Sequence, residues 1–317
     1  MRLFFVTDIH GSDLCFRKFL GAAGGRKRAD VLVIGGDILG KVLVPIVHLR
    51  SGHYQATSRG RVYKLESKAA VREFELALAA FGTYGHPCGE EEAEEVRSNP
   101  ELAESVLTKA RIARLERWLD LAERRLQNST VTLIINPGND DPFYVDGLLR
   151  KSAKVIVPEG IAVELPDGLT MISTGYTNRT PWNCPRDIGE NELAERIRRM
   201  TATISDFDGC IFNFHAPPFG TGLDLAPEID AELRPVLDLG GNGVPVGSVA
   251  VLEAIRECQP LVGLHGHVHE SHAFALIGRT MCFNPGSDYE NGNLQGVFLE
   301  IGSDRRISFY GLTREDG

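Results

Sequence analysis

The sequence lacks any apolar run that could cross a membrane. Across its 317 residues, no stretch approaches the ~18 consecutive apolar residues that a spanning helix needs. The opening apolar segment gives way to polar residues almost at once and is too short for a secretory signal peptide. We therefore expect a cytoplasmic protein that is not held in a membrane.

The sequence also has neither paired cysteines nor an excess of basic charge. Its six cysteines are widely scattered, and none belongs to a Cys-x-x-Cys pair, so we expect reduced thiols. With 34 basic and 43 acidic residues, the chain has a net charge of -9 and no general attraction to nucleic acid or to an anionic membrane. A phosphate-bearing substrate would need a locally positive site.

What the sequence does contain is a set of short apolar segments that predict the buried strands of an α/β protein. Val31-Leu-Val-Ile is followed by Gly-Gly and Asp37, which is typical of a strand that is buried on both faces and ends abruptly. A strand at 3–7, a helix capped by Ser12 and this strand form a unit that builds parallel sheets. Ligands bind at the carboxyl ends of such strands, so Asp37 lies where a site is expected.

The remaining elements extend this pattern over the whole chain, which we interpret as a single domain, 1–317. We expect strands at 131–135, 155–157, 161–164, 171–173, 210–214, 261–264 and 280–283, helices at 190–205 and 248–258, a turn at 240–243, and a terminal hairpin at 295–301 and 307–310.

Residues 41–128 interrupt this series of strands. A structureless loop of that length would be unusual, and the segment contains a predicted hairpin at 53–57 and 61–65 and predicted helices at 67–81 and 101–127. We interpret it as an inserted subdomain. It either packs against the main domain with no further role or forms a lid that shapes a substrate pocket.

Five predicted strands end in residues that bind metals in other proteins. These residues are Asp8 and His10, Asp37, Asn139, His215, and His267 and His269. Alternate side chains of an extended segment share a face, so Asp-x-His and His-x-His can each act as one pair. Carboxylate and imidazole ligands together suit first-row transition ions.

The charges of these residues would make such a site attractive to phosphate. Two divalent ions would contribute a charge of +4, and the carboxylates of Asp8 and Asp37 contribute -2. The site would therefore have a net charge of about +2, although the protein as a whole is acidic. Two ions ~3.5–4 Å apart that share one carboxylate can hold a hydroxide and stabilise both the attacking and the leaving oxygen. Each motif alone is weak, but their order and their places at strand ends are specific as a set.

The order and spacing of these motifs resemble those of the calcineurin-like metallophosphoesterase superfamily, which has Asp-x-His, Gly-Asp, Gly-Asn-x-Asp/Glu, a lone His and Gly-His-x-His. Thr174-Gly-Tyr and Asn284-Pro-Gly-Ser also resemble a prokaryotic branch of uncertain substrate. The resemblance implies a four-layer sandwich of two stacked mixed β-sheets flanked by helices, with the helical insertion. It also implies that Asp8, His10, Asp37 and His269 hold one ion, and that Asp37, Asn139, His215 and His267 hold the other.

The sequence departs from the family pattern at Asp140. Many members have a histidine after the motif asparagine, where it can protonate the leaving group. An aspartate beside two cations should stay ionised and be a poor acid. We name Asp140 as a candidate catalytic residue. The alternatives are that it only supports the ligands or is solvated, and that His53 or His86 supplies the proton.

The resemblance predicts a metal-dependent phosphoric ester hydrolase. A metal-bridging hydroxide would attack phosphomonoesters or phosphodiesters, with small molecules as the favoured substrates. The ions could be manganese, iron, zinc or nickel, and the oligomeric state is left open. Lys41 and Arg179 could contact substrate phosphate or be solvated.

Two alternatives to this function stay open. A nuclease of the same superfamily is less favoured because no basic stripe with aromatic residues is visible. A catalytically weak scaffold or binding protein on the same fold should have lost ligands, and this chain keeps all seven.

Overall fold

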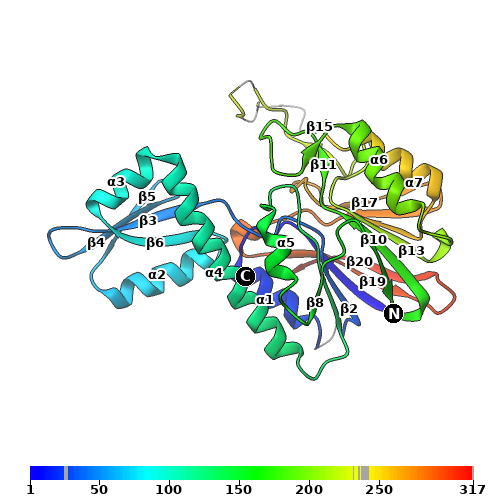
Figure 1. The fold of residues 1–317 in the computed structure, drawn as a ribbon, viewed down its shortest axis with the longest axis horizontal. Helices are drawn as coiled ribbons and strands as arrows, with labels where there is room; N and C mark the ends of the chain where they lie inside the picture. The colour runs from blue at the N-terminus through cyan, green and yellow to red at the C-terminus, as the bar shows by residue number, and fades with distance from the viewer. Residues whose placement is uncertain (25–27, 231, 235, 237–242, 316–317) are drawn as a thin grey trace.

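The computed structural model describes residues 1–24, 28–230, 232–234, 236 and 243–315. Within these ranges, two six-stranded sheets lie face to face and carry helices on their outer faces (Figure 1). The α/β sandwich predicted from the sequence is confirmed. Most of the predicted turn at 240–243 lies outside the described residues.

The first sheet has the strand order β20-β19-β1-β2-β7-β8 and is mixed. Its central strands are parallel to one another, whereas β19 runs antiparallel to β1 and β20 antiparallel to β19. The strands are β1 (Arg2–Val6), β2 (Val31–Ile34), β7 (Thr132–Ile135), β8 (Val155–Ile156), β19 (Leu294–Ile301) and β20 (Ile307–Glu315).

The second sheet has the order β17-β18-β16-β13-β10-β9 and is also mixed. Strands β10, β13, β16 and β18 are parallel, and β9 and β17 are antiparallel edges. The strands are β9 (Ala162–Leu165), β10 (Leu169–Thr174), β13 (Cys210–Phe214), β16 (Val262–Leu264), β17 (Ala273–Ile277) and β18 (Thr280–Asn284).

Three apolar layers hold the sandwich together. Alternation along β1 sends Leu3 and Phe5 toward the second sheet and Phe4 and Val6 toward the helices of the first. The helices on that side are α1 (Asp13–Gly21), α4 (Pro100–Leu126) and α5 (Tyr144–Leu149); α6 (Glu190–Thr201) and α7 (Val249–Cys258) cover the second sheet. All four β1 side chains are fully buried, and each such burial stabilises the fold by about 1.5–3 kcal/mol.

The insertion forms a four-stranded sheet of its own, which projects from the sandwich (Figure 1). It comprises β3 (Leu43–His48), β4 (Tyr54–Ser58), β5 (Arg61–Leu65), α2 (Lys68–Ala80), β6 (Tyr84–Gly89) and α3 (Glu90–Ser98), and α4 leads back to the main sheet. The hairpin and helices α2 and α4 occur where the sequence predicts them. Strands β3 and β6 and helix α3 were not predicted.

Two buried arginines of α4 fix the insertion to the loops after β1 and β2. Arg114 donates to the carbonyl oxygens of Gly11 at 2.7 Å and Thr83 at 2.8 Å. Arg111 donates to the carbonyl oxygen of Gly40 at 2.8 Å. Charged donors make stronger hydrogen bonds than neutral ones, so these contacts hold both loops in place near the carboxyl ends of the strands.

The helices begin at the residues that their sequences favour. Ser12 accepts from the Cys15 N–H at the start of α1, and Ser248 accepts from the Val251 N–H at the start of α7.

None of the described helices is long and apolar enough to cross a membrane. Two short sheets, β11 (Thr177–Asn178) with β12 (Asp187–Ile188) and β14 (Leu225–Ala226) with β15 (Val244–Pro245), lie in the loops beyond the strand ends.

Candidate metal centre

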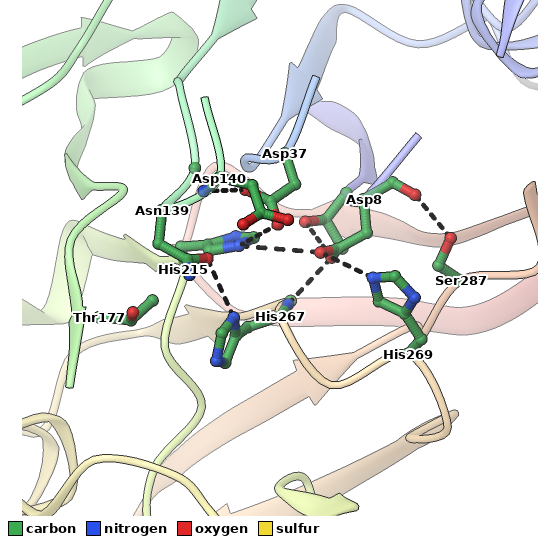
Figure 2. A network of polar contacts seen from close by, with 12 residues as sticks. Asp8, Asp37, Asn139, Asp140, Thr177, His215, His267, His269 and Ser287 are labelled. Carbon is green, nitrogen blue, oxygen red and sulfur yellow. Dashed lines mark hydrogen bonds and ion pairs between the residues drawn. The ribbon is translucent and has the colours of Figure 1, made fainter. Parts of the chain in front are cut away.

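The seven side chains named from the sequence come together at the carboxyl ends of β1, β2, β7, β13 and β16. Figure 2 shows six of them around one small space, with the ring of His215 behind the carboxylates. Asp8, His10 and His269 form one group of ligand atoms within 4.8 Å of one another, and Asp37, His215 and His267 form a second. A third group joins His10 and Asp37 to Asp140.

The distances between these ligand atoms are those expected around a shared ion. Asp37 Oδ2 lies 3.5 Å from His215 Nε2 and 3.8 Å from His10 Nε2. Asp8 Oδ1 lies 3.4 Å from His269 Nε2, and 3.7 Å from His215 Nε2 of the other group. Two ligands that are each ~2.1 Å from one ion are separated by roughly 3.0 Å at right angles and by at most about 4.2 Å, so the spacing of the ligands that would share an ion fits an ion placed between them.

Each carboxylate has one oxygen held by the protein and one that faces histidines. Asp8 Oδ2 accepts from the Thr7 hydroxyl at 2.6 Å and from the His267 N–H at 3.0 Å. Asp37 Oδ1 accepts from the Asp140 N–H at 3.0 Å. Asp8 Oδ1 and both ring nitrogens of His215 are buried and have no hydrogen-bond partner among the described residues. A bound ion would satisfy such atoms.

The backbone of the site is held in an uncommon conformation. Asp8, His10, Asp37 and His267 have positive φ angles of 52°, 39°, 48° and 69°, a region that non-glycine residues rarely adopt and that costs about 1–3 kcal/mol each. A side chain at Gly138 is impossible here, because its Cβ would lie 2.1 Å from Asp37 Oδ1. Strain of this kind collects at functional sites.

Burial and mutual attraction shift the pKa values of the cluster in opposite directions. Burial alone would raise the pKa of Asp8, but His215 and His269 outweigh it and lower that pKa to about 2. Burial would lower the pKa of His215, but Asp37 and Asp8 raise it to about 9. Burial lowers the pKa values of His10 and His267, which keeps these rings neutral and ready to act as ligands.

Asp140 lies beside the cluster and is held by two neighbours. Its side chain forms an ion pair with Lys41 and accepts from the Cys184 thiol at 2.7 Å. The two other proton donors considered from the sequence lie on the insertion, where His53 pairs with Glu66 and His86 with Glu92. Arg179 is exposed and does not line the pocket, whereas Lys41 does.

Asp141 joins the two loops that carry Asp37 and Asn139. Its carboxylate accepts from the N–H groups of Gly138 at 2.8 Å, Ile38 at 2.9 Å and Leu39 at 3.0 Å. Burial and the charge of Asp37 raise the pKa of Asp141 to about 7. The acidic residue that ends the Gly-Asn-x-Asp/Glu motif thus has a positioning role that follows from its backbone contacts.

Asp187 orients the amide of Asn139, and sequence reasoning missed it. Asn139 Nδ2 donates to Asp187 Oδ1 at 2.9 Å, which leaves Asn139 Oδ1 at 3.0 Å from His267 Nδ1. Thr177, drawn in Figure 2, also donates to Asp187, at 3.2 Å. No local pattern marks Asp187 as part of the site, because Asn139 lies 48 residues away in the sequence.

Arg186 was missed as well. Its side chain is 1% exposed and contacts the carbonyl oxygens of Gly138 and Asp141 and the carboxylate of Asp146. Its own N–H donates to the Asn139 carbonyl oxygen at 3.2 Å. The guanidinium therefore fixes the loop that carries Asn139.

A pocket of about 350 Å³ opens beside the cluster. Its lining includes polar residues of the site, among them Asp37, Asn139, Asp140, His267 and His269. The lining also includes a set of apolar residues, here called the apolar wall: Trp182, Ala226, Pro227, Ile229, Leu233 and Val246. Apart from Lys41, no residue of the insertion is among the described lining residues, and its role as a lid stays a prediction.

Comparisons with known proteins support the fold. No family model matches the chain. The chain is 23% identical over 193 residues to the uncharacterized protein MJ1162 of Methanocaldococcus jannaschii, covering 60% of this chain and 80% of that protein. The crystal structure of TT1561 of Thermus thermophilus matches 98% of both chains with a TM-score of 0.53 and 11% identity.

A solved structure with a named activity is more distant. The structure of a novel archaeal phosphodiesterase matches 99% of this chain and 100% of its own with 12% identity and a TM-score of 0.36. The likeness to TT1561 is one of fold, and it agrees with the α/β sandwich that the sequence predicts.

Proposed function

We propose that the chain is a phosphoric ester hydrolase that uses two divalent transition-metal ions. Asp8, His10, Asp37 and His269 would hold one ion, and Asp37, Asn139, His215 and His267 the other. The observation that carries the proposal is that buried ligand atoms of Asp8 and His215 have no hydrogen-bond partner among the described residues, and that each belongs to a different one of two ligand groups. When bound, such ions activate water at neutral pH and offset the charge that develops on phosphoryl oxygens.

The chain's own residues would prepare the site for an anionic substrate. The carboxylates of Asp8 and Asp37 would neutralise only two of the four positive charges of the ions, so the site would keep a net positive charge. Lys41, whose pKa is raised by Asp140 against the effect of burial, adds a cation at the edge of the pocket. The pocket volume of about 350 Å³ suits a small-molecule phosphate ester.

Asp140 would position Lys41 at the edge of the pocket. Its carboxylate lies in the pocket wall between Lys41 and Cys184. Because Asp140 forms an ion pair with Lys41, we assign it the role of holding Lys41 in place rather than that of general acid. Substrates with good leaving groups, which need no proton, are then favoured.

Hydrolysis of p-nitrophenyl phosphate and bis-p-nitrophenyl phosphate with added Mn²⁺ tests the proposal. The wild-type protein should hydrolyse at least one ester and lose this activity with EDTA. Asp37→Asn removes a bridging charge and should lower kcat/KM by about 100-fold or more. Asp120→Asn, on the exposed face of α4, is the matched control and should leave kcat/KM unchanged.

Two results would contradict the proposed hydrolase. Near-normal turnover by Asp37→Asn would remove the bridging role of Asp37. Two ions bound without hydrolysis of either ester would favour the scaffold alternative, and cleavage of single-stranded DNA in place of both esters would favour the nuclease.

A further inference from the structure

The apolar wall of the pocket is unusual for a site that handles phosphate. Trp182 is 57% exposed and Leu233 is 43% exposed, although both line the pocket beside the cluster. None of the described aromatic rings stacks on Trp182. An exposed indole face at the mouth of a pocket is a suitable surface for a planar group, because stacking adds to the gain from burial.

Among the described residues, the side chains of the wall offer almost no partner for the hydroxyl groups of a sugar or polyol. Its described side chains are those of Trp182, Ala226, Pro227, Ile229, Leu233 and Val246, and apart from the indole N–H these contain only carbon and hydrogen. Hydroxyl groups that lose water without gaining a hydrogen bond weaken binding. The charged groups of the pocket, including Lys41 and Asp140, lie near the cluster instead.

Both halves of the wall are anchored to the rest of the molecule. Asn178 Nδ2 donates to the Val246 carbonyl oxygen at 3.0 Å, and the Val246 N–H donates to the Asp224 carbonyl oxygen at 3.0 Å. The loop that carries Trp182 is held by Asp187, which accepts from the Cys184 N–H at 2.9 Å. The parts of the wall at Trp182 and Val246 are therefore preformed, which favours binding because these parts need little ordering.

We propose that this wall, with Trp182 as its stacking surface, is a subsite for an aromatic group carried by the substrate's phosphate. This subsite rests on the proposed phosphoesterase function and narrows its substrates to small aryl or aryl-bearing phosphate esters. The phosphoryl group would face the metal-ligand cluster, and the ring would lie against Trp182. Aliphatic and polyol phosphates would bind less well.

Binding of phenylphosphonate and methylphosphonate to the Mn²⁺-loaded protein tests the subsite. Neither compound has an ester bond, so calorimetry measures binding without turnover. Phenylphosphonate should bind the wild-type protein about 10-fold or more tightly than methylphosphonate. Trp182→Ala should reduce this preference to about threefold or less and leave methylphosphonate binding unchanged. Trp182→Tyr, which keeps a ring, should retain most of the preference.

Phe274→Ala is the matched control, since Phe274 is an aromatic residue on β17 that is 50% exposed and does not line the pocket. It should keep the wild-type preference. Equal binding of both phosphonates, binding of neither, or an unchanged preference in Trp182→Ala would overturn the subsite. Hydrolysis of p-nitrophenyl esters by the same sample separates the two proposals, because activity without a phenyl preference overturns the subsite alone. A phenyl preference without activity overturns only the hydrolase.

Discussion

In the metal-free protein, His215 should carry a proton at neutral pH, and this proton must leave before the ring can bind an ion. The ring is buried, and its Nε2 lies 3.5 Å from Asp37 Oδ2 and 3.7 Å from Asp8 Oδ1. Burial opposes the charged form, but the two carboxylates outweigh burial and raise the pKa of His215 to about 9. Metal ligation requires the neutral imidazole, so ion and proton compete.

The size of this competition follows from that pKa. At pH 7, two pH units below it, the protonated ring is favoured about 100-fold. The affinity of the site for its ions should therefore rise by at least about tenfold per pH unit between pH 7 and 9. Binding at pH 7 should release at least one proton, because the pKa of His269 is raised as well.

Calorimetric titration of the metal-free protein with Mn²⁺ measures both quantities. The heat at pH 7 should differ between buffers of different ionisation enthalpy, and the difference gives the protons released. His48→Gln, which changes an exposed histidine on β3, should release as many protons as wild type. Heats that are independent of the buffer, together with equal affinities at pH 7 and 9, would refute the reasoning.

Three further predictions concern stability and the residues that position the ligands. Because the folded-state pKa of His215 is raised to about 9, its stabilisation of the metal-free protein is complete below the unfolded value of about 6.5 and is lost as the pH rises through 9. The Tm of metal-free protein, measured by calorimetry, should therefore fall between pH 6.5 and 9. Asp187→Ala releases the Asn139 amide and should weaken Mn²⁺ binding about 10- to 100-fold, as measured by titration. Arg186→Lys replaces a planar fork with a point charge and should lower the free energy of unfolding by about 3 kcal/mol in urea.

Each of these predictions has a control and an outcome that contradicts it. The Mn²⁺-loaded protein should show a smaller fall in Tm, and a rising Tm in the metal-free protein would oppose the assigned charge of His215. Asp120→Ala should bind Mn²⁺ like wild type, and wild-type affinity in Asp187→Ala would show that Asn139 needs no support. Arg72→Lys, at an exposed position on α2, should have the free energy of unfolding of the wild type. If Arg186→Lys also had the wild-type value, the planar guanidinium of Arg186 would not be needed for stability.

The main sandwich could be predicted from the sequence because its strands are fully buried. Val31–Ile34 is buried at every position, so its composition alone indicates a central strand. The strands and helices of the insertion were harder to predict from the sequence. Strand β3 contains Pro45 and strand β6 contains Pro87, and proline is uncommon in strands. Helix α3 is dominated by glutamate and buries only Ala93 and Val96, which leaves little apolar periodicity to detect.

The candidate ligands could be named from the sequence because each lies in the segment just after the carboxyl end of a strand. The residues that position them could not. Arg186 directly precedes the short strand β12 and Asp187 begins it, and their partners Asp146 and Asn139 are 40 and 48 residues away. These contacts form only when the fold brings the loop after β7 and the loop after β11 together. No local pattern in the sequence therefore predicts them.

Anomalous diffraction from crystals grown with Mn²⁺ tests the central claim most directly. We predict two anomalous peaks ~3.5–4 Å apart, on either side of the Asp37 carboxylate, with Asp8, His10 and His269 around one and Asn139, His215 and His267 around the other. A single peak, no peak, or two peaks that do not share Asp37 would contradict the dinuclear centre.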